Sequence, residues 1–332
     1  MDPLTHTLTG LTLGRAGLNR VSAYATPILL LAASAPDIDV ITLLWGETNY
    51  LHWHRHLTHS FVLLPLLALL PVLVVRLFAR KPFLWRRSYL VSLAGIATHP
   101  LLDWMHPYGI RFLLPFSKDW YRLDITNLAD LWIWGVLIIA ALAPLLGKLV
   151  SSEIGARPGS GRGFAIAGLC FLALYPWGRY LLHERALTLL DSVLYEGTAP
   201  VRVAAVPQAF SPFSWTGLVE TSQLYSVHEI NLLGQFDPTS GHTLYKPELS
   251  PQDTAAAAAA RTTESFRVFL EFAQYPYWRF TPADHPQDAI RVECMDLRFG
   301  APPHPRFVAS AVVDRAGRVL ESTFTFEPPA DR

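Results

Sequence analysis

Carboxylate and histidine side chains lie inside or beside long apolar runs in the N-terminal part of the chain. Asp37 and Asp39 follow Pro36 in the segment APDID, and His99 precedes Asp103 in the segment THPLLD. A charged group in hydrocarbon is costly, so charges at such positions usually serve a function. Imidazole and carboxylate groups are also the ligands that divalent metal ions prefer. These residues predict a metal site at the edge of a membrane.

The spacing of each pair indicates how it could bind an ion. His99 and Asp103 stand four positions apart, which places them on one helix face. They fit either two metal ligands or a buried hydrogen bond that only stabilises helix packing. Asp37 and Asp39 would raise each other's pKa unless a cation compensates them, and the alternative is a solvated loop with ordinary acids. Pro36 disfavours a regular helix, so both carboxylates can face one site.

The segment 52–60, HWHRHLTHS, carries four histidines just ahead of an apolar run. Four imidazoles cannot all bind one ion directly, and side chains at such a boundary can also be interfacial. Arg55 could bind an anionic substrate group or a carboxylate of the site. His6 stands alone near the N-terminus, where a single histidine is usually structural or exposed.

The combined pattern is stronger than its parts, because three segments bring acid and imidazole to the same predicted side of the membrane. Such a site with a free coordination position can lower the pKa of bound water to about 7 and supply hydroxide. This chemistry supports hydrolysis of a phosphoester, ester or amide. Zinc fits the mixture of histidine and aspartate best, and manganese or a two-metal site remains open. An uncoordinated Asp or His could act as general base.

Composition favours a membrane protein. The chain has 332 residues, a formal net charge of zero and 51% hydrophobic residues, which argues against disorder and against nucleic-acid binding. Apolar residues crowd the first part of the chain, so we expect a helical membrane domain over residues 1–183 and an extracytoplasmic α+β domain over residues 184–332. Cys170 and Cys294 fall in different domains and predict no disulfide framework. We see no removable signal peptide.

Six membrane segments are expected, and the first of them is short. A full span needs about 20 residues, and residues 4–18 offer fewer. Gly10 and Gly14 in this segment form a small-xxx-small pattern, which favours close helix packing. The other five expected spans are residues 24–45, 60–75, 88–105, 131–147 and 164–182.

The distribution of basic residues predicts the orientation of these spans. Arginine and lysine concentrate in residues 15–20, 76–87 and 148–162, which the positive-inside rule places in the cytoplasm. The connections 46–59 and 106–130 would then face outward and carry aromatic residues suited to an interfacial belt. The metal residues and the C-terminal domain would lie on the same extracytoplasmic side.

Residues 184–332 predict a small α+β domain. A helix is expected over residues 254–275, because the alanine run and the later phenylalanine spacing suit one. We find neither a catalytic motif nor an internal repeat in this part. The expected strands, which are rich in β-branched or alternating residues, are 201–206, 218–230, 290–299, 306–314 and 318–326.

The ordered motifs resemble the membrane-bound metal-dependent hydrolase family, the YdjM-like, LexA-regulated inner-membrane proteins of bacteria. The resemblance covers roughly the first 180 residues. Relatives commonly carry glycine where His56 stands, which counts against His56 as a shared ligand. Tyr108, Gly109, Pro115 and Asp130 fit the family more loosely. The closely matching elements are His6 with Gly10 and Gly14, PDxD at 36–39, HRxxTHS at 54–60, and HxxxD at 99–103.

The resemblance implies a multi-pass hydrolase of the bacterial inner membrane with a metal centre. Because the site lies at the lipid boundary, a lipid or lipid-linked phosphoester is the expected substrate. His54 would be a ligand or an acid–base group, and Arg55, with Arg111, would hold an anionic group. The expected catalytic residues are His54, Arg55 and Asp39. The expected metal ligands are His6, Asp37, Asp39, His59, His99 and Asp103.

Two other functions fit part of the pattern. The chain could be a metal-binding membrane scaffold whose outer domain binds a partner, without catalysis. It could also be a metal or proton transporter, because acids and histidines within the membrane also mark ion paths. The acids here cluster towards one end, and residues 131–147 contain none, which argues against a path across the bilayer.

Overall fold

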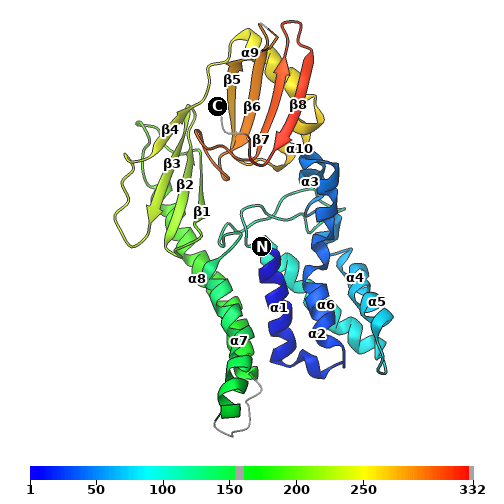
Figure 1. Cartoon of the computed structure of the whole chain (residues 1–332). Helices are drawn as coiled ribbons and strands as arrows, with labels where there is room; N and C mark the ends of the chain where they lie inside the picture. The colour runs from blue at the N-terminus through cyan, green and yellow to red at the C-terminus, as the bar shows by residue number, and fades with distance from the viewer. Residues whose placement is uncertain (154–160, 284, 287, 329–332) are drawn as a thin grey trace. The chain divides into compact units, whose positions relative to one another are not determined.

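The computed structural model describes residues 1–153, 161–283, 285–286 and 288–328 (Figure 1). It divides into two compact units, and each unit is built from three segments that alternate along the chain. The first unit comprises Met1–Asp39, Arg55–Glu184 and Pro207–Ser214. The second unit comprises Val40–His54, Arg185–Val206 and Trp215–Arg332. The basic connection 148–162 lies partly outside the described residues.

Helices build the first unit. Their bounds are α1 Pro3–Ala16, η1 Leu18–Arg20, α2 Ala25–Ser34, η2 Ala35–Trp45, η3 Leu57–His59, α4 Leu64–Leu67, α5 Leu69–Phe78, α6 Trp85–Trp104, α7 Leu131–Glu153 and α8 Arg162–Asp191. The end of η2 and the end of α8 pass into the second unit, which also holds α3 Glu47–Trp53.

The N-terminal helix α1 is capped at both ends and packs closely on α2. The Asp2 carboxylate accepts two backbone N–H groups of the first turn, and Gly17, with φ 146°, follows the last residue. A Cβ atom at Gly10 would lie 2.6 Å from the carbonyl oxygen of Leu29, so only glycine fits there. The close packing expected from the small-residue pattern is confirmed.

The segment that carries both N-terminal acids leaves the α-helical conformation. After α2 the chain continues as the 3-10 helix η2, which begins at Ala35, directly before Pro36. Proline supplies no backbone N–H and constrains the residue before it, which accounts for the change at this point. The interruption expected at Pro36 is therefore present, as a tighter helix rather than an open loop.

The expectation of six membrane spans is wrong for the described residues. Three helical segments are long and apolar enough to cross a bilayer, namely Ala25–Trp45, Leu131–Leu149 and Arg162–Asp191. The pair Glu47–His59 and Leu64–Phe78, bent by 86°, raises the number to four if it counts as one broken span. Exposed side chains on α7 are largely leucine, isoleucine and tryptophan, and α8 exposes Phe164, Ile166, Leu174, Trp177 and Leu181, as expected of helices that face lipid.

The missing spans have physical reasons. The 14 residues of α1 rise only about 21 Å, less than the hydrocarbon core of a bilayer. The expected span at 60–75 is divided into the short helices α4 and α5. Helix α6 is long enough, but it carries Arg86, Arg87 and Asp103, so its apolar stretch is interrupted.

The second unit contains two four-stranded sheets that follow chain order. Helices α9 and α10 contact strands of the second sheet, and both sheets contribute to one apolar core that includes Leu218, Tyr225, Met295 and Val308. The first sheet is β1 Arg202–Pro207, β2 Ser214–Glu220, β3 Leu224–Asn231 and β4 His242–Tyr245. The second sheet is β5 Pro276–Pro282, β6 Ile290–Asp296, β7 Val308–Val313 and β8 Val319–Thr325, with antiparallel neighbours.

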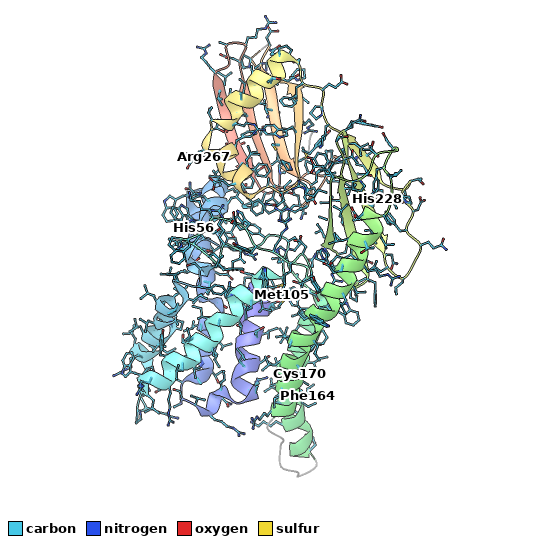
Figure 2. All side chains as sticks on the ribbon, turned by 180° about the vertical axis from the view of Figure 1, so that it is seen from behind. His56, Met105, Phe164, Cys170, His228 and Arg267 are labelled. Carbon is cyan, nitrogen blue, oxygen red and sulfur yellow. The ribbon has the colours of Figure 1, made fainter. Side chains whose placement is uncertain are left out.

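Details of the α+β domain differ from expectation. The single strand expected at 218–230 is the hairpin of β2 and β3, and β4 and β5 were not expected. The helix expected at 254–275 is two helices, α9 Pro251–Arg261 and α10 Glu264–Phe272. Thr262 follows the last residue of the first helix, and Thr263 caps the second, because its side chain accepts the backbone N–H of Phe266. Both cysteines are free, Cys170 on α8 (Figure 2) and Cys294 in β6.

Candidate metal centre

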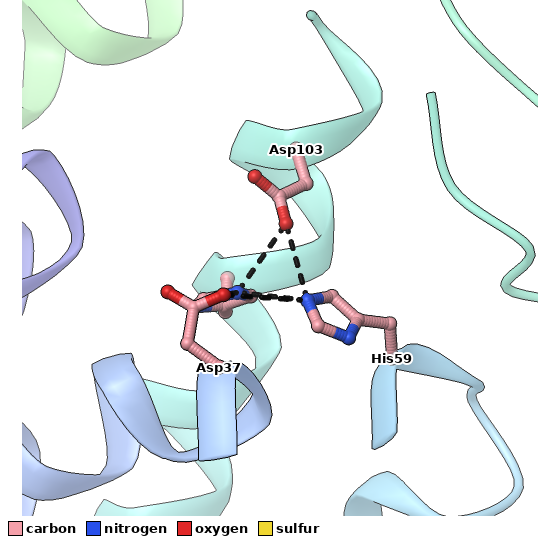
Figure 3. A group of neighbouring side chains, drawn as sticks. Asp37, His59 and Asp103 are labelled. Atoms are coloured by element: carbon pink, nitrogen blue, oxygen red, sulfur yellow. Dashed lines mark hydrogen bonds and ion pairs between the residues drawn. The ribbon is translucent and has the colours of Figure 1, made fainter. Parts of the chain in front are cut away.

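Four side chains from three segments of the first unit converge on one small volume (Figure 3). Asp37 comes from η2, His59 from η3, and both His99 and Asp103 from one face of α6. One ligand atom of each lies within 4.8 Å of all the others. His59, His99 and Asp103 are fully buried, whereas the Asp37 side chain keeps 22% of its surface exposed. The structure thus brings together four of the six expected ligands.

The distances within this group are those of ligands around one ion. Nε2 of His99 lies 3.3 Å from Oδ1 of Asp37 and 3.3 Å from Oδ2 of Asp103. Nε2 of His59 lies 3.1 Å from Nε2 of His99, 3.3 Å from Oδ2 of Asp103 and 3.7 Å from Oδ1 of Asp37. Ligand atoms around a tetrahedral ion with bonds of about 2.0–2.1 Å lie about 3.3–3.4 Å apart. The four atoms therefore approximate the corners of such a tetrahedron.

Oδ2 of Asp103 supports the same interpretation. Two imidazole nitrogens lie 3.3 Å away, yet this oxygen is buried and accepts no hydrogen bond from the described residues. A buried carboxylate oxygen without a partner is costly. The nitrogens and the oxygen face a common point rather than one another, which is the arrangement of atoms that share a cation.

His99 is held with one nitrogen available. Its Nδ1 lies 2.6 Å from the carbonyl oxygen of Ala33 in α2, and a carbonyl oxygen can only accept. Nδ1 therefore carries the proton, and Nε2 presents its lone pair to the group. A backbone carbonyl that orients a ligating histidine in this way is common in metal sites.

His59 is held in the same sense by a carboxylate. Its Nδ1 lies 3.3 Å from Oδ2 of Asp39 and 3.0 Å from Oγ1 of Thr58. The Thr58 hydroxyl donates to the same Asp39 oxygen at 2.8 Å. Asp37 and Asp39 thus contact opposite nitrogens of one imidazole. Asp39, which we expected as a ligand, lies behind His59 in this arrangement.

Arg55 contacts a carboxylate of the site. Its guanidinium lies 2.9 Å from Oδ1 of Asp103 and donates to the carbonyl oxygen of Gly109 at 3.0 Å. Its backbone N–H donates to Asp39 at 3.0 Å. The residue is buried and adopts a φ of 56°, a conformation that is costly for a side chain of this size. Of the two roles expected for Arg55, these contacts favour the bond to a site carboxylate.

His6 lies at the edge of the group. Its ring stacks on His99 with centroids 3.7 Å apart, and its Nε2 lies 3.4 Å from Oδ1 of Asp103. The side chain is fully buried, and neither ring nitrogen has a hydrogen-bond partner among the described residues. His6 therefore contacts the oxygen of Asp103 that faces away from the four converging atoms.

Two further expected residues contact aromatic rings. His54 follows α3 and belongs to the second unit, where its ring stacks on Tyr50 with centroids 4.5 Å apart. Its role as ligand or acid–base group stays a prediction. Arg111 is buried, and its guanidinium lies 4.5 Å from the ring centroid of Trp120.

Sequence analysis did not assign several supporting groups. Thr58 was expected only as part of a motif. Its position next to His59 in the chain is the feature from which a contact with that imidazole could have been predicted. The carbonyl groups of Ala33 and Gly109 carry no side-chain signal at all. The ring of Tyr108 lies 4.8 Å from the Arg55 guanidinium and forms a cation–π contact with it.

Helices with exposed apolar surface and a buried His/Asp cluster define a membrane protein with a possible metal-binding site. The family model of the YdjM inner membrane protein matches residues 1–186, more than half of the chain, and the chain belongs to this family. The model of the YfhP C-terminal alpha/beta plait domain matches residues 255–327, which include α10 and β5 to β8.

A curated relative shares both parts of the chain. The chain is 26% identical over 335 residues to the uncharacterized protein YfhP of Bacillus subtilis (strain 168), covering 93% of this chain and 90% of the relative. The matched region therefore includes most of the C-terminal domain. No solved structure matches the chain. Neither family description names a reaction.

Proposed function

We propose that this protein is a membrane-embedded, metal-dependent hydrolase. The observation that carries the proposal is the near-tetrahedral group of Asp37, His59, His99 and Asp103, with two imidazole lone pairs directed at one another. Two such lone pairs would repel at this distance, and a cation between them removes the repulsion. A Zn²⁺ ion bound there would lower the pKa of a coordinated water to about 7 and supply a nucleophile.

The donor set fits a single divalent ion. Oδ2 of Asp103 faces the two imidazoles, while Oδ1 pairs with the Arg55 guanidinium. The positive charge of this guanidinium beside Oδ1 would repel a second metal ion at that oxygen. Imidazole and carboxylate ligands favour zinc, and manganese would be the other outcome of metal analysis.

The side of the group next to Asp37 is the proposed entry for water and substrate. Asp37 is partly exposed, whereas the other three donors are fully buried. Catalytic zinc sites keep a position for water, and because all four donors here come from the protein, water would need either a fifth position on this side or displacement of Asp37. The residues that face the buried side then serve to hold the ligands.

The remaining polar residues take separate roles in this proposal. Asp39 and Thr58 orient His59, and Arg55 orients Asp103, so all three are positioning residues. His6 is the buried imidazole that is left, and because it stacks on His99 and lies 3.4 Å from Oδ1 of Asp103, it is also proposed to hold these two ligands in place. The earlier assignment of His6 as a ligand is the alternative outcome of its test.

The proposed substrate class is an ester or phosphoester of a lipid or lipid-linked molecule. The support is the position of the donors in helices whose outer side chains, such as Leu101 in α6, are apolar and exposed. We also propose that the site and the C-terminal domain face the extracytoplasmic side. This orientation follows from the basic residues in the connection between α5 and α6.

The proposal is tested with the full chain purified in detergent. Metal content is measured by elemental analysis, and hydrolysis of short-chain phospholipids and of nitrophenyl phosphodiesters is followed with and without chelator. We expect about one ion per chain and activity that chelator removes and metal restores. Asp37→Asn should lose both metal and activity, whereas the control Asp119→Asn, an exposed acid outside the group, should keep both. Full metal content in Asp37→Asn, or activity unaffected by chelator, would refute the proposal.

A further inference from the structure

A pocket whose lining includes none of the four converging donors lies in the first unit. It is a pocket of about 430 Å³ whose walls include the residues after α6 and the last turns of α8 within this unit. Four aromatic side chains contribute to it, namely Trp104, Trp120, Tyr121 and Tyr180. Three of these rings also pack on Tyr108 or Phe112. A cleft lined by aromatic rings and a few polar groups is the usual form of a small-ligand site.

One buried carboxylate of this pocket is incompletely satisfied. Asp124 lines the pocket and retains only 7% of its surface exposed. Its Oδ2 accepts a hydrogen bond from Nε of Arg122 at 2.9 Å. Its Oδ1 is buried and has no hydrogen-bond partner among the described residues. A buried anionic oxygen without a partner is costly, so a ligand that brings a positive charge close to it would be stabilised.

The charges of the lining select the sign of that ligand. Asp124 and Glu184 contribute two carboxylates, Arg122 contributes one permanently charged cation, and the imidazole of His183 lies 3.7 Å from the Glu184 carboxylate. A phosphate or carboxylate group would meet like charge in this pocket. A cation would instead find carboxylate oxygens and the negative faces of aromatic rings, the combination by which proteins recognise ammonium groups.

We propose that this pocket binds an alkylammonium group, of the kind carried by ethanolamine and choline head groups. The ammonium group pairs with the Asp124 carboxylate and lies beside the rings of Trp104 and Tyr180, because the Arg111 guanidinium already lies over the Trp120 ring. The volume of the pocket suits a small head group rather than a whole lipid, whose apolar chains would remain outside.

The pocket begins next to the candidate metal centre. Trp104 directly follows Asp103, and the carbonyl oxygen of Trp104 accepts the backbone N–H of Leu123 at 2.9 Å. This short connection couples the end of α6 to the loop that carries Asp124. A role of the pocket in holding a zwitterionic phospholipid for cleavage would rest on the proposed hydrolase function, whereas ammonium binding itself does not.

Binding is measured by calorimetry on the full chain in a polyoxyethylene detergent, which contains neither amine nor sugar. The soluble probes are glycerophosphocholine and glycerophosphoethanolamine, with glycerophosphoglycerol as a matched probe that lacks the ammonium group. We expect saturable binding of the first two and none of the third. Choline chloride and nanodiscs of phosphatidylethanolamine or phosphatidylglycerol then distinguish a free amine from a lipid head group as the source of the ligand.

Two variants locate the binding site. Asp124→Asn should weaken binding of glycerophosphocholine at least about tenfold, because it removes the charge from the unpaired oxygen. Tyr180→Leu changes an exposed side chain and should weaken binding about threefold without affecting folding. Asp119→Asn, a neighbouring exposed acid, is the control and should bind as the parent does.

Other results would overturn the inference. Equal binding of glycerophosphoglycerol, saturable binding of maltose in place of the amines, or unchanged affinity in both Asp124→Asn and Tyr180→Leu would each exclude an ammonium site. Metal content is measured in the same samples and should be unchanged in Asp124→Asn. If the ammonium probes do not bind but the protein retains its metal, only the pocket proposal fails. If the parent protein contains no metal, only the proposed metal centre fails.

Discussion

The Nε2 atoms of His59 and His99 lie 3.1 Å apart although the two residues are 40 positions apart in the chain. The Nδ1 atom of each ring has other partners. Nδ1 of His99 contacts the Ala33 carbonyl oxygen, and Nδ1 of His59 contacts Asp39 and Thr58. The Thr58 hydroxyl gives its single proton to Asp39, so Nδ1 of His59 must carry a proton of its own. Both Nε2 atoms therefore present lone pairs to the same point, and a cation is the simplest group to accept them.

His6→Gln distinguishes a residue that holds the ligands from a ligand. Nε2 of His6 faces Oδ1 of Asp103, outside the four-atom group, so the variant should still bind metal. Metal affinity, and hydrolysis with it, should fall about 10–100-fold, the usual effect of removing a group that orients a ligand. Elemental analysis and the phosphodiester assay on the same sample check both statements. Loss of the ion from His6→Gln would make His6 a ligand instead.

Asp39→Asn distinguishes an orienting carboxylate from a ligand. Asparagine keeps the size of the side chain but no longer matches the N–H of His59 and the Thr58 hydroxyl with a charged acceptor. We expect metal affinity to fall about 10–100-fold, as for other residues that orient ligating histidines. Asp37→Asn should lose the ion altogether. Competition with a chelator of known affinity gives both values, and equal losses in the two variants would place Asp39 among the ligands.

The proposed orientation predicts which loops are accessible from outside the cell. In a background with Cys170→Ala and Cys294→Ala, Asp119→Cys should react with a membrane-impermeant maleimide in intact cells. Arg80→Cys, in the basic connection between α5 and α6, should react only after permeabilisation, because basic loops stay in the cytoplasm. The reverse pattern would place the candidate site on the cytoplasmic side.

A buried ion pair in the second unit predicts a pH-dependent stability. Asp296 and Arg298 are buried, with Nη2 and Oδ2 2.6 Å apart. Burial raises the pKa of the Asp296 carboxyl, but the Arg298 guanidinium and two backbone N–H groups hold this pKa below its usual value. The stabilisation is therefore present above the pKa of an unfolded aspartate, about 3.9, and is lost as the pH falls.

Asp296→Asn removes this pair. We expect it to destabilise the second unit by about 3–5 kcal/mol at pH 7, because the Arg298 charge is left buried without its partner. The difference from the parent should shrink below about pH 4. Limited proteolysis of the full chain at both pH values follows the change, with the exposed Glu229→Gln as control. A variant as resistant as its parent at pH 7 would contradict this account.

Local sequence predicted those parts of the site that depend on local spacing. The four-residue interval from His99 to Asp103 sets both side chains on one helical face, whatever the rest of the fold does. The sequence could not predict that Asp37 lies among the converging donors while Asp39 orients His59, because this depends on which nitrogen of His59 each carboxylate contacts. Arg55 was ambiguous for the same reason, since its partner Asp103 lies 48 positions away in the chain.

The elements that position the site were predicted less well than the site itself. Apolar content alone suggested a span at 60–75, but the chain there is broken into α4 and α5. In the second unit, β5 contains Tyr277, Trp278 and Arg279 between prolines, and no alternation of apolar and polar residues marks it as a strand. This segment is a strand because it pairs with β6 along its whole length, from Pro276 to Pro282, and that pairing cannot be predicted from the local sequence.

X-ray absorption spectroscopy on the zinc-loaded full chain in detergent tests the central claim most directly. One zinc per chain with about two imidazole nitrogens and two carboxylate oxygens in the first coordination sphere is the expected result, with one further oxygen from water for an open site. A spectrum without imidazole scattering, or a purified protein that binds no stoichiometric metal, would contradict the account.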